Sequence, residues 1–273
     1  MLQTPVSDVR WAQQAADAVR QSLLNEPPQQ LPPLPMMRTI GSQSEEHYLV
    51  NMREYVADLI AEAALRPTSH ILDIGSGCGR VATAFTRYMD TSGSYLGLDV
   101  WDEGVQWCTD NITSDRPNFR FRTVSASNNY YYSDDSGHAN EFGLSFVPTD
   151  HFDCIFALSV FTHLKLSDAR QYFELISRSL TKDGCAYLTF FVIDEDVHSY
   201  VRNTGNHTDL APAGDGMWYA YERQDFFSGY ELPLLMAQFD EFGLEVVKQS
   251  RGSWAQKPGA RLYQDWFLLR RAR

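Results

Sequence analysis

The amino-acid sequence predicts a doubly wound α/β fold: a seven-stranded, mostly parallel sheet with a reversed last strand, preceded by a helical N-terminal arm. Three observations favour this fold. Apolar strand patterns alternate with amphipathic helix patterns, which is typical of a parallel sheet covered on both faces. A buried strand runs into a glycine-rich turn before a helix. The last two strand patterns are joined by a loop too short for a crossover helix, so they are expected to pair antiparallel.

Residues 1–41 are predicted to form an arm whose composition differs from the rest of the chain. A weakly amphipathic helical stretch at residues 11–24 is followed by a proline-rich connector. Five prolines are expected to keep this connector extended: Pro27, Pro28, Pro32, Pro33 and Pro35. The connector is expected to lay the arm over the rest of the protein, and a ligand for a proline-recognition domain is the alternative.

Residues 42–273 are predicted to form one domain, and its first half contains three strands. It begins with Ser42-Gln43-Ser44-Glu45, which has the spacing of a helix capping box, and the helix is expected to end near Arg66-Pro67. Strands and helices then alternate, with strands predicted at residues 70–74, 94–99 and 118–124 and helices at residues 80–89 and 103–112.

The second half of the domain is predicted to add four strands and two long insertions. The strands are expected at residues 152–159, 185–193, 244–249 and 262–269. A helix before the second of these strands is expected to stop at Lys182-Asp183-Gly184, and another is expected at residues 233–242. The insertions lie at residues 125–150 and 194–231, and insertions of this length in a compact domain are usually functional or mobile.

The charge composition argues against polyanionic partners. The chain has 23 Lys and Arg against 35 Asp and Glu, a net charge of −12, so its field repels nucleic acid and anionic membranes. No stretch approaches the ~20 apolar residues of a membrane span, and no signal-peptide pattern is visible, so a cytoplasmic protein is expected. The four cysteines have no metal-site spacing and are expected to be reduced core residues.

The most informative motif is a glycine-rich turn between a buried strand and a helix. It reads Asp73-Ile74-Gly75-Ser76-Gly77-Cys78-Gly79, and its glycines are spaced GxGxG rather than the GxGxxG of dinucleotide sites. A carboxylate such as Asp73 repels a pyrophosphate but suits a ligand that carries an ammonium and a sulfonium group. Asp99 ends the next strand, 20 residues after Gly79, where an acidic residue accepts hydrogen bonds from ribose hydroxyls.

On these motifs and on the order of its elements, the sequence resembles the class I S-adenosylmethionine-dependent methyltransferases over residues 42–269. The resemblance implies a Rossmann-like fold, S-adenosylmethionine as cofactor and methyl transfer to a small molecule. It also implies sites for each part of the cofactor. The implied cofactor-binding residues are Asp73, Gly75, Ser76, Gly77 and Gly79 for the methionine part, Asp99 for the ribose, Val100, Trp101, Ser125 and Ala126 for the adenine, and Ser159 at the fourth strand end.

If the turn has no ligand, its glycines only close a strand-to-helix connection and Asp99 only caps a helix. A different enzyme class, a nicotinamide-dependent oxidoreductase, is disfavoured because its fingerprint is missing. A non-catalytic S-adenosylmethionine-binding sensor or partner subunit is the alternative from another class.

The predicted acceptor is a small-molecule hydroxyl, although oxygen, nitrogen, carbon and sulfur are all compatible with the motifs. Methyl transfer often requires no strong catalytic group, but a base near neutral pKa helps a hydroxyl to react, and His163 is the candidate catalytic residue. The alternative is that His163 only packs at the start of a helix. His198 and His207 lie near acidic residues, but their spacing is not distinctive of a metal site, and no metal is predicted.

Two aromatic segments in the insertions are candidates for the walls of an acceptor pocket. They are residues 130–132, which are all tyrosine, and residues 218–221, which read Trp-Tyr-Ala-Tyr. Ligands of open α/β sheets bind at the carboxyl edge of the sheet, where both insertions are expected. Ordinary core packing is the alternative for both segments.

Overall fold

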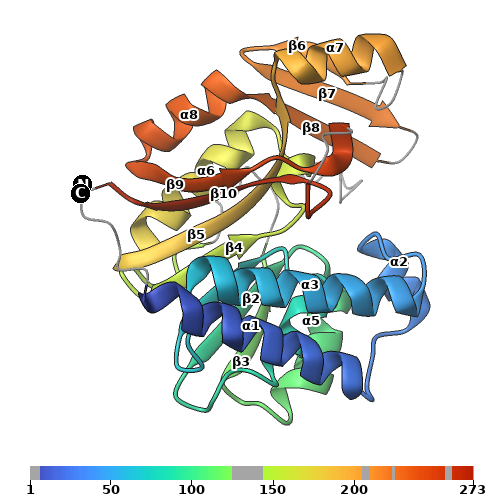
Figure 1. Cartoon of the computed structure of the whole chain (residues 1–273), viewed down its shortest axis with the longest axis vertical. Coiled ribbons are helices and arrows are strands. Elements are labelled where there is room, and N and C mark those ends of the chain that lie inside the picture. The colour runs from blue at the N-terminus through green and yellow to red at the C-terminus, as the bar shows by residue number, and fades with distance from the viewer. Residues whose placement is uncertain (1–6, 125–143, 205–209, 223–224, 256–259, 273) are drawn as a thin grey trace. The chain divides into compact units, whose positions relative to one another are not determined.

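The computed structural model describes residues 7–124, 144–204, 210–222, 225–255 and 260–272. The chain divides into two compact units (Figure 1). The first comprises residues 1–124 and 152–154, and the second comprises residues 125–151 and 155–273. Among the described helices, none is both long and apolar enough to cross a membrane.

The first unit contains the arm and the first three strands. Its helices are α1 (Ser7–Asn25), α2 (Leu34–Thr39), α3 (Glu45–Ala63), α4 (Arg80–Phe85) and α5 (Asp102–Cys108), which continues into one π-helical turn (Thr109–Thr113). Its strands are β1 (His70–Ile74), β2 (Ser94–Asp99) and β3 (Phe119–Thr123), in the order β3-β2-β1. Both pairs are parallel, as the strand-helix alternation predicts. The division between the units falls within β4 (Phe152–Ala157).

The second unit contains the remaining elements. Its helices are a 3-10 turn (Phe161–His163), α6 (Leu166–Ser179), α7 (Glu195–Thr204), α8 (Leu232–Glu241) and a second 3-10 turn (Ser253–Ala255). Its strands are β5 (Leu180–Ile193), β6 (Ala211–Gly214), β7 (Met217–Glu222), β8 (Asp225–Glu231), β9 (Leu244–Ser250) and β10 (Asp265–Arg271).

The predicted reversed strand is confirmed. β10 pairs antiparallel with both β5 and β9, and a register shift between Leu268 and Leu269 interrupts the second pairing. The predicted number of strands is wrong, because the described residues contain ten strands rather than seven. The additional three come from the insertion at residues 194–231: β8 pairs parallel with the end of β5, and β7 and β6 continue antiparallel from it.

Several predicted boundaries are also wrong. The helix α6 stops at Ser179 and not at the predicted Lys182-Asp183-Gly184. These three residues belong to β5, because the pairing of the strand overrides the local preference for a turn. The helix after the glycine turn ends at Phe85 instead of residue 89. The helix cap of α3 is Ser44, whose hydroxyl accepts from the backbone N–H of His47 at 3.1 Å, instead of Ser42.

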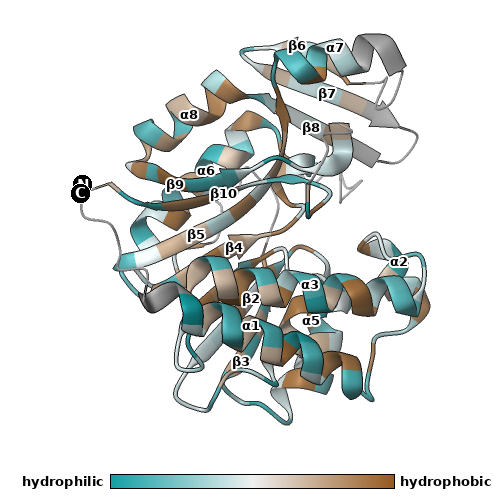
Figure 2. Ribbon diagram, viewed as in Figure 1, coloured by the Kyte–Doolittle hydropathy of each residue, from teal (hydrophilic) through white to brown (hydrophobic). Residues whose placement is uncertain are grey.

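The N-terminal arm is helical and packs within the first unit. Four residues of α1 at helical spacing are buried: Ala12, Ala16, Val19 and Leu23. Figure 2 shows hydrophilic and hydrophobic residues alternating along α1 and α3. The two helices are also joined by an ion pair between Arg20 of α1 and Glu54 of α3, at 3.2 Å. The prediction that the whole proline run is extended is wrong at its end, because Pro35 lies in the first turn of α2, where a missing N–H breaks no helical bond.

Candidate functional site

The glycine turn after β1 is held by the end of β2. Gly75, Gly77 and Gly79 have φ values of 81°, 54° and 76°, a left-handed backbone that residues with a Cβ adopt at a cost. The N–H groups of Gly75 and Ser76 donate to the carbonyl oxygen of Leu98 at 2.7 and 3.0 Å. The turn is therefore a rigid extension of the two paired strands.

Two of the three glycines are also required by packing. A Cβ on Gly77 would lie 2.8 Å from Cγ2 of Ile40, and a Cβ on Gly79 would lie 2.8 Å from Sγ of Cys108. Gly75, in contrast, is exposed. Of the three, Gly75 is thus the one whose backbone is open to a bound molecule.

Ser76 lies beneath the turn. A Cβ on Gly97 of β2 would lie 3.0 Å from the Cβ of Ser76, and the Ser76 side chain is only 6% exposed. The Ser76 hydroxyl has no hydrogen-bond partner among the described residues. The side chain of Ser76, which is predicted to bind the cofactor, therefore points toward the sheet.

Asp99 connects the end of β2 to the glycine turn. Its Oδ2 accepts from the N–H of Gly77 at 2.6 Å, and its Oδ1 accepts from the N–H of Trp101 at 2.9 Å. Burial raises the pKa of Asp99, and these backbone N–H groups oppose the rise. Asp99, Val100 and Trp101 are all half-buried, so the carboxylate and its neighbours keep part of their surface accessible.

Asp73 is almost completely buried and is paired with a tyrosine. It is 3% exposed, and its Oδ2 accepts a hydrogen bond from the hydroxyl of Tyr95 on β2. Burial raises the pKa of Asp73 to about 8, the Tyr95 hydrogen bond lowers it, and the charge of Asp99 raises it. The sequence analysis did not single out Tyr95, although a tyrosine inside a buried strand requires a polar partner for its hydroxyl.

The arm contributes residues beside the same turn. Nη1 of Arg80, at the start of α4, donates to the carbonyl oxygen of Ile40 at 3.4 Å and to Oγ of Ser42 at 3.1 Å. The guanidinium also lies over the ring of Tyr55, 5.3 Å from its centroid. Together with Ile40 above Gly77, these contacts make the end of the arm one wall of the glycine turn.

These residues fit a ligand that is cationic at one end and carries hydroxyl groups. The exposed Gly75 lies in the chain between two acidic residues, the buried Asp73 and the half-buried Asp99. Carboxylates attract an ammonium or sulfonium group and accept from ribose hydroxyls. The acidic groups beside the turn therefore suit S-adenosylmethionine better than a diphosphate.

In the second unit, Ser159 lies just after β4 with a strained backbone. Its φ is 61°, which is uncommon for a residue other than glycine. Its N–H donates to Oγ1 of Thr189 at 2.8 Å, and its hydroxyl lies 3.1 Å from Oε1 of Gln264. Backbone strain that neighbouring side chains stabilise is common at functional sites. Sequence reasoning found Ser159 but missed Thr189 and Gln264.

His163 ends the 3-10 turn after β4 and is half-buried. Its ring lies 5.1 Å from the ring of Phe227, measured between centroids. The buried hydroxyl of Tyr230 donates to the carbonyl oxygens of Phe161 and Leu164, at 3.0 and 2.9 Å, and so holds both ends of the turn. Phe227 and Tyr230 belong to β8, which means that the insertion at residues 194–231 positions the candidate base.

The aromatic segment at residues 218–221 is at least partly core. Trp218 is 9% exposed and lies in a hydrophobic cluster with Phe191 and Trp254. Its Nε1 donates to Oε1 of Glu231 at 3.1 Å, and its ring contacts that of His198 edge-on at 4.7 Å. The prediction of an acceptor-pocket wall is therefore wrong for Trp218, because its ring is needed to fill the second unit.

Some predicted residues lie outside the described part of the chain. They are Ser125, Ala126, the tyrosines at 130–132 and His207. Among the described residues, no group of three or more His, Cys, Asp or Glu side chains could hold a metal ion.

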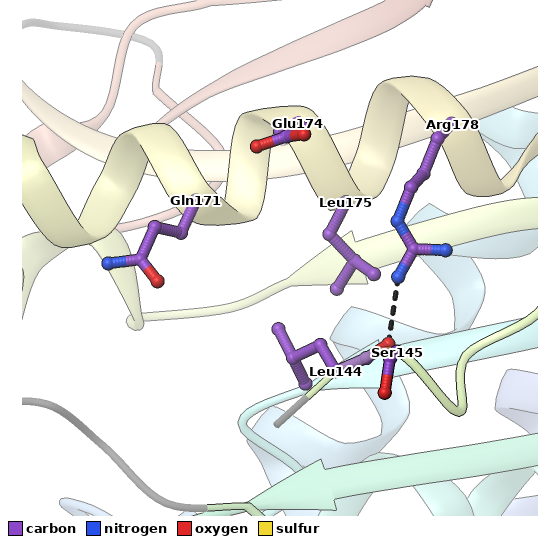
Figure 3. A pocket seen from close by; sticks show the side chains of 6 residues that line it. All are labelled: Leu144, Ser145, Gln171, Glu174, Leu175 and Arg178. Carbon is purple, nitrogen blue, oxygen red and sulfur yellow. Dashed lines mark hydrogen bonds between the residues drawn. The ribbon is translucent and has the colours of Figure 1, made fainter. Parts of the chain in front are cut away.

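A cavity of about 190 Å³ in the second unit lies apart from the predicted site residues (Figure 3). Side chains of α6 and of the segment at residues 144–145 line it: Leu144, Ser145, Gln171, Glu174, Leu175 and Arg178. Arg178 closes one end by donating to the carbonyl oxygens of Leu144 and Val147, at 2.8 and 2.7 Å. None of the residues predicted from the sequence lines this cavity.

Comparison with known proteins identifies one family over most of the chain. A family model described as a methyltransferase domain matches residues 48–249. The match includes the glycine turn, the ends of β2 and β4 and the insertion at residues 194–231, and it leaves out the arm at residues 1–41 and β10.

Solved structures share the fold at low sequence identity. The 1,6-didemethyltoxoflavin-N1-methyltransferase of Burkholderia thailandensis, solved with 1,6-didemethyltoxoflavin and S-adenosylhomocysteine bound, has a TM-score of 0.54 and 15% identity over 95% of this chain and 90% of its own. The PH0226 protein of Pyrococcus horikoshii has a TM-score of 0.57 and 13% identity, over 85% and 93%. An S-adenosylmethionine-dependent methyltransferase of Leishmania major has a TM-score of 0.55 and 14% identity, over 95% and 83%.

Proposed function

Because this chain belongs to the family of methyltransferase domains, and is an S-adenosylmethionine-dependent methyltransferase, we propose that its acceptor is the hydroxyl group of a small molecule. The observation that carries the proposal is His163, a half-buried imidazole in a turn that Tyr230 holds at both ends. A hydroxyl acceptor requires a base, whereas a neutral amine does not.

The donor is proposed to bind at the glycine turn of the first unit. Asp73 and the glycine turn, Gly75-Ser76-Gly77-Cys78-Gly79, are assigned to the methionine part: the exposed Gly75 offers its backbone, and Gly77 and Gly79 shape the turn. Asp99 is assigned to the ribose hydroxyls. The proposed adenine contacts are Val100, Trp101, Ser125 and Ala126. For Ser159, in the second unit, the likeness to the family implies a role in cofactor binding, and its positive φ supports that role. The support is the exposure of Gly75 between two carboxylates, which suits a cationic donor.

S-adenosylmethionine, when bound, supplies a methyl group that a nucleophile displaces from a positively charged sulfur. The protein then has two tasks, to align the acceptor and to remove its proton. We assign the second task to an imidazole nitrogen of His163, which takes the hydroxyl proton as the oxygen forms its new bond to carbon. The contacts of Phe227 and Tyr230 keep the His163 ring and its turn in place for that transfer.

A small molecule is the proposed acceptor class on grounds of charge and of likeness. A net charge of −12 repels the phosphate backbone of nucleic acids. The Burkholderia thailandensis enzyme, similar in fold, was solved with a small molecule bound and methylates a nitrogen of it according to its name.

The test measures transfer of a labelled methyl group to paired small molecules that differ only in carrying a hydroxyl or an amine. The wild-type protein is expected to methylate the hydroxyl member of each pair. His163→Asn should lower kcat by about a hundredfold to ten-thousandfold, the contribution of a general base, and leave S-adenosylhomocysteine affinity unchanged.

His151→Asn is the matched control, because His151 is an exposed imidazole of the same unit. It is expected to keep the wild-type kcat. Methylation of the amine members alone, or wild-type turnover by His163→Asn, would show that the proposed acceptor or base is incorrect.

A further inference from the structure

One buried hydrogen bond of the first unit is unexplained by packing alone. Tyr95 is 1% exposed and Asp73 is 3% exposed, yet the tyrosine hydroxyl and the carboxylate meet in the interior. A buried carboxylate is costly in its charged form, and a single donor offsets only part of that cost. A phenylalanine and a small apolar residue would fill the same space without it.

Aromatic packing fixes the orientation of the Tyr95 ring and thereby the position of its hydroxyl. It stacks on Phe119 of β3 at 5.0 Å between centroids, with 15° between the planes. Phe85 and Phe121 contact it at 6.0 Å each. The hydroxyl position is thus set by the aromatic core, and Asp73 receives a fixed donor at the base of the glycine turn.

The charged and titratable groups around Asp73 come from several elements. Tyr95 and Asp99 face it from β2, Arg80 from α4 and Cys108 from α5, while Cys154 of β4 faces Tyr95. Arg80 and Tyr95 favour the ionised carboxyl, whereas Asp99 and burial disfavour it. Among these groups, Tyr95 contacts Asp73 directly, through the hydrogen bond from its hydroxyl.

We infer that Tyr95 is a positioning residue of the donor site, which keeps the Asp73 carboxylate oriented and able to ionise so that it can receive the cationic methionine end of the donor. This inference rests on the proposed donor site. Tyr95 itself is buried beneath the turn and acts only through Asp73. Removing its hydroxyl therefore leaves the site intact in shape and changes the pH at which the site accepts a cation.

Donor affinity is expected to depend on pH through the ionisation of Asp73. Asp73 must be ionised to attract an ammonium group, so donor affinity should rise with pH until its carboxyl has lost its proton, at about 8. Tyr95 lowers the pKa of Asp73. Its loss therefore raises that pKa further, and the rise in affinity moves to higher pH.

The experiment is calorimetric titration of S-adenosylhomocysteine into the full chain at a series of pH values, for wild type and Tyr95→Phe. We expect the midpoint of the affinity rise to move up by about one pH unit in Tyr95→Phe, which is about tenfold weaker binding at pH 7. The affinities should converge again at a pH above both midpoints. Replacing Tyr95 with 3-fluorotyrosine, a stronger donor of the same shape, should move the midpoint the opposite way.

Tyr88→Phe is the matched control, since Tyr88 is a tyrosine of the same unit whose hydroxyl donates to a backbone oxygen, that of Leu65. Its pH profile should equal that of the wild type. The inference is overturned if Tyr95→Phe keeps the wild-type profile, or if Tyr88→Phe shifts it equally. The 3-fluorotyrosine protein keeps the shape of the core and therefore provides the test if Tyr95→Phe does not fold. The inference is also overturned if that protein leaves the midpoint unchanged. Failure of the wild-type protein to bind S-adenosylhomocysteine at any pH would instead refute the proposed donor site.

Discussion

At the scale of single residues, two acidic side chains beside the glycine turn have different environments. Asp99 is half-buried and its oxygens accept from backbone N–H groups, among them those of Gly77 and Trp101, so its orientation is set by the turn itself. Asp73 is buried and accepts a hydrogen bond from a side chain, that of Tyr95. The first carboxylate is part of the backbone network, whereas the second is a buried acid whose charge depends on pH.

The raised pKa of Asp73 has a consequence for stability. In the unfolded chain its carboxyl ionises near the ordinary value of 3.8, and in the folded protein at about 8. Between these values the folded state binds more protons than the unfolded state. Stability contributed by this site is therefore present at low pH and falls as pH rises through the window, by up to about 1.4 kcal/mol per pH unit.

Asp73→Asn removes this titration and keeps an acceptor for Tyr95. We expect the melting temperature of the variant, relative to wild type and without ligand, to increase steadily from pH 5 to pH 8. Asp90→Asn is the control, because Asp90 is exposed and hydrogen bonds from Ser92 lower its pKa, so it is ionised across this window. A difference between Asp73→Asn and wild type that stays constant with pH would mean that the Asp73 carboxyl is not protonated in the folded protein.

At the scale of elements, the arm and the insertion at residues 194–231 each support one part of the site. The arm places Ile40 over Gly77 and bonds to Arg80. The insertion supplies β8, whose Tyr230 holds the His163 turn. Both elements extend beyond the regular strand-helix alternation, and each lies in a different compact unit.

The packing of α1 can be tested with two neighbouring leucines. Leu23 is 1% exposed and Leu24 is 56% exposed. Leu23→Ala should lower the free energy of unfolding by about 2 to 5 kcal/mol, as expected for a cavity in a packed core. Leu24→Ala should change it by less than about 0.5 kcal/mol. Urea denaturation provides the measurement, and equal effects of the two substitutions would show that α1 does not belong to the core of the first unit.

At the scale of the whole molecule, the fold and the ligand class are linked by the glycine turn. The parallel strands β1 and β2 bring Gly75 and Asp99 to one edge, because the carboxyl ends of parallel neighbours lie together. The reversed β10 and the match to the methyltransferase family both separate this chain from nicotinamide-dependent enzymes.

Ligand-dependent melting distinguishes the two cofactor classes in the intact protein. S-adenosylhomocysteine at about 100 times its Kd should stabilise the folded state by about 2.7 kcal/mol and raise the melting temperature by about 5 °C or more. NAD at the same concentration is expected to leave the melting temperature unchanged. Stabilisation by NAD and not by S-adenosylhomocysteine would contradict the assigned donor class.

Much of the architecture could be predicted from local patterns. β1 and β2 were predicted with their observed bounds, because a buried strand beside a glycine turn is marked by its own residues. The antiparallel closing strands were predicted from a short loop. β6, β7 and β8 were missed, because short strands of mixed polarity are defined by the partners they pair with and not by their own periodicity.

What the sequence by itself determined is therefore the class of fold, the family and the chemistry of the glycine turn, all of which depend on residues close together in the chain. The tertiary structure alone decided which side chains support them. Tyr95 lies 22 residues from Asp73, Gln264 lies 105 from Ser159, and Tyr230 lies 69 from Phe161. Such contacts form only when distant strands pack together, and no local pattern encodes the meeting of two side chains across a core.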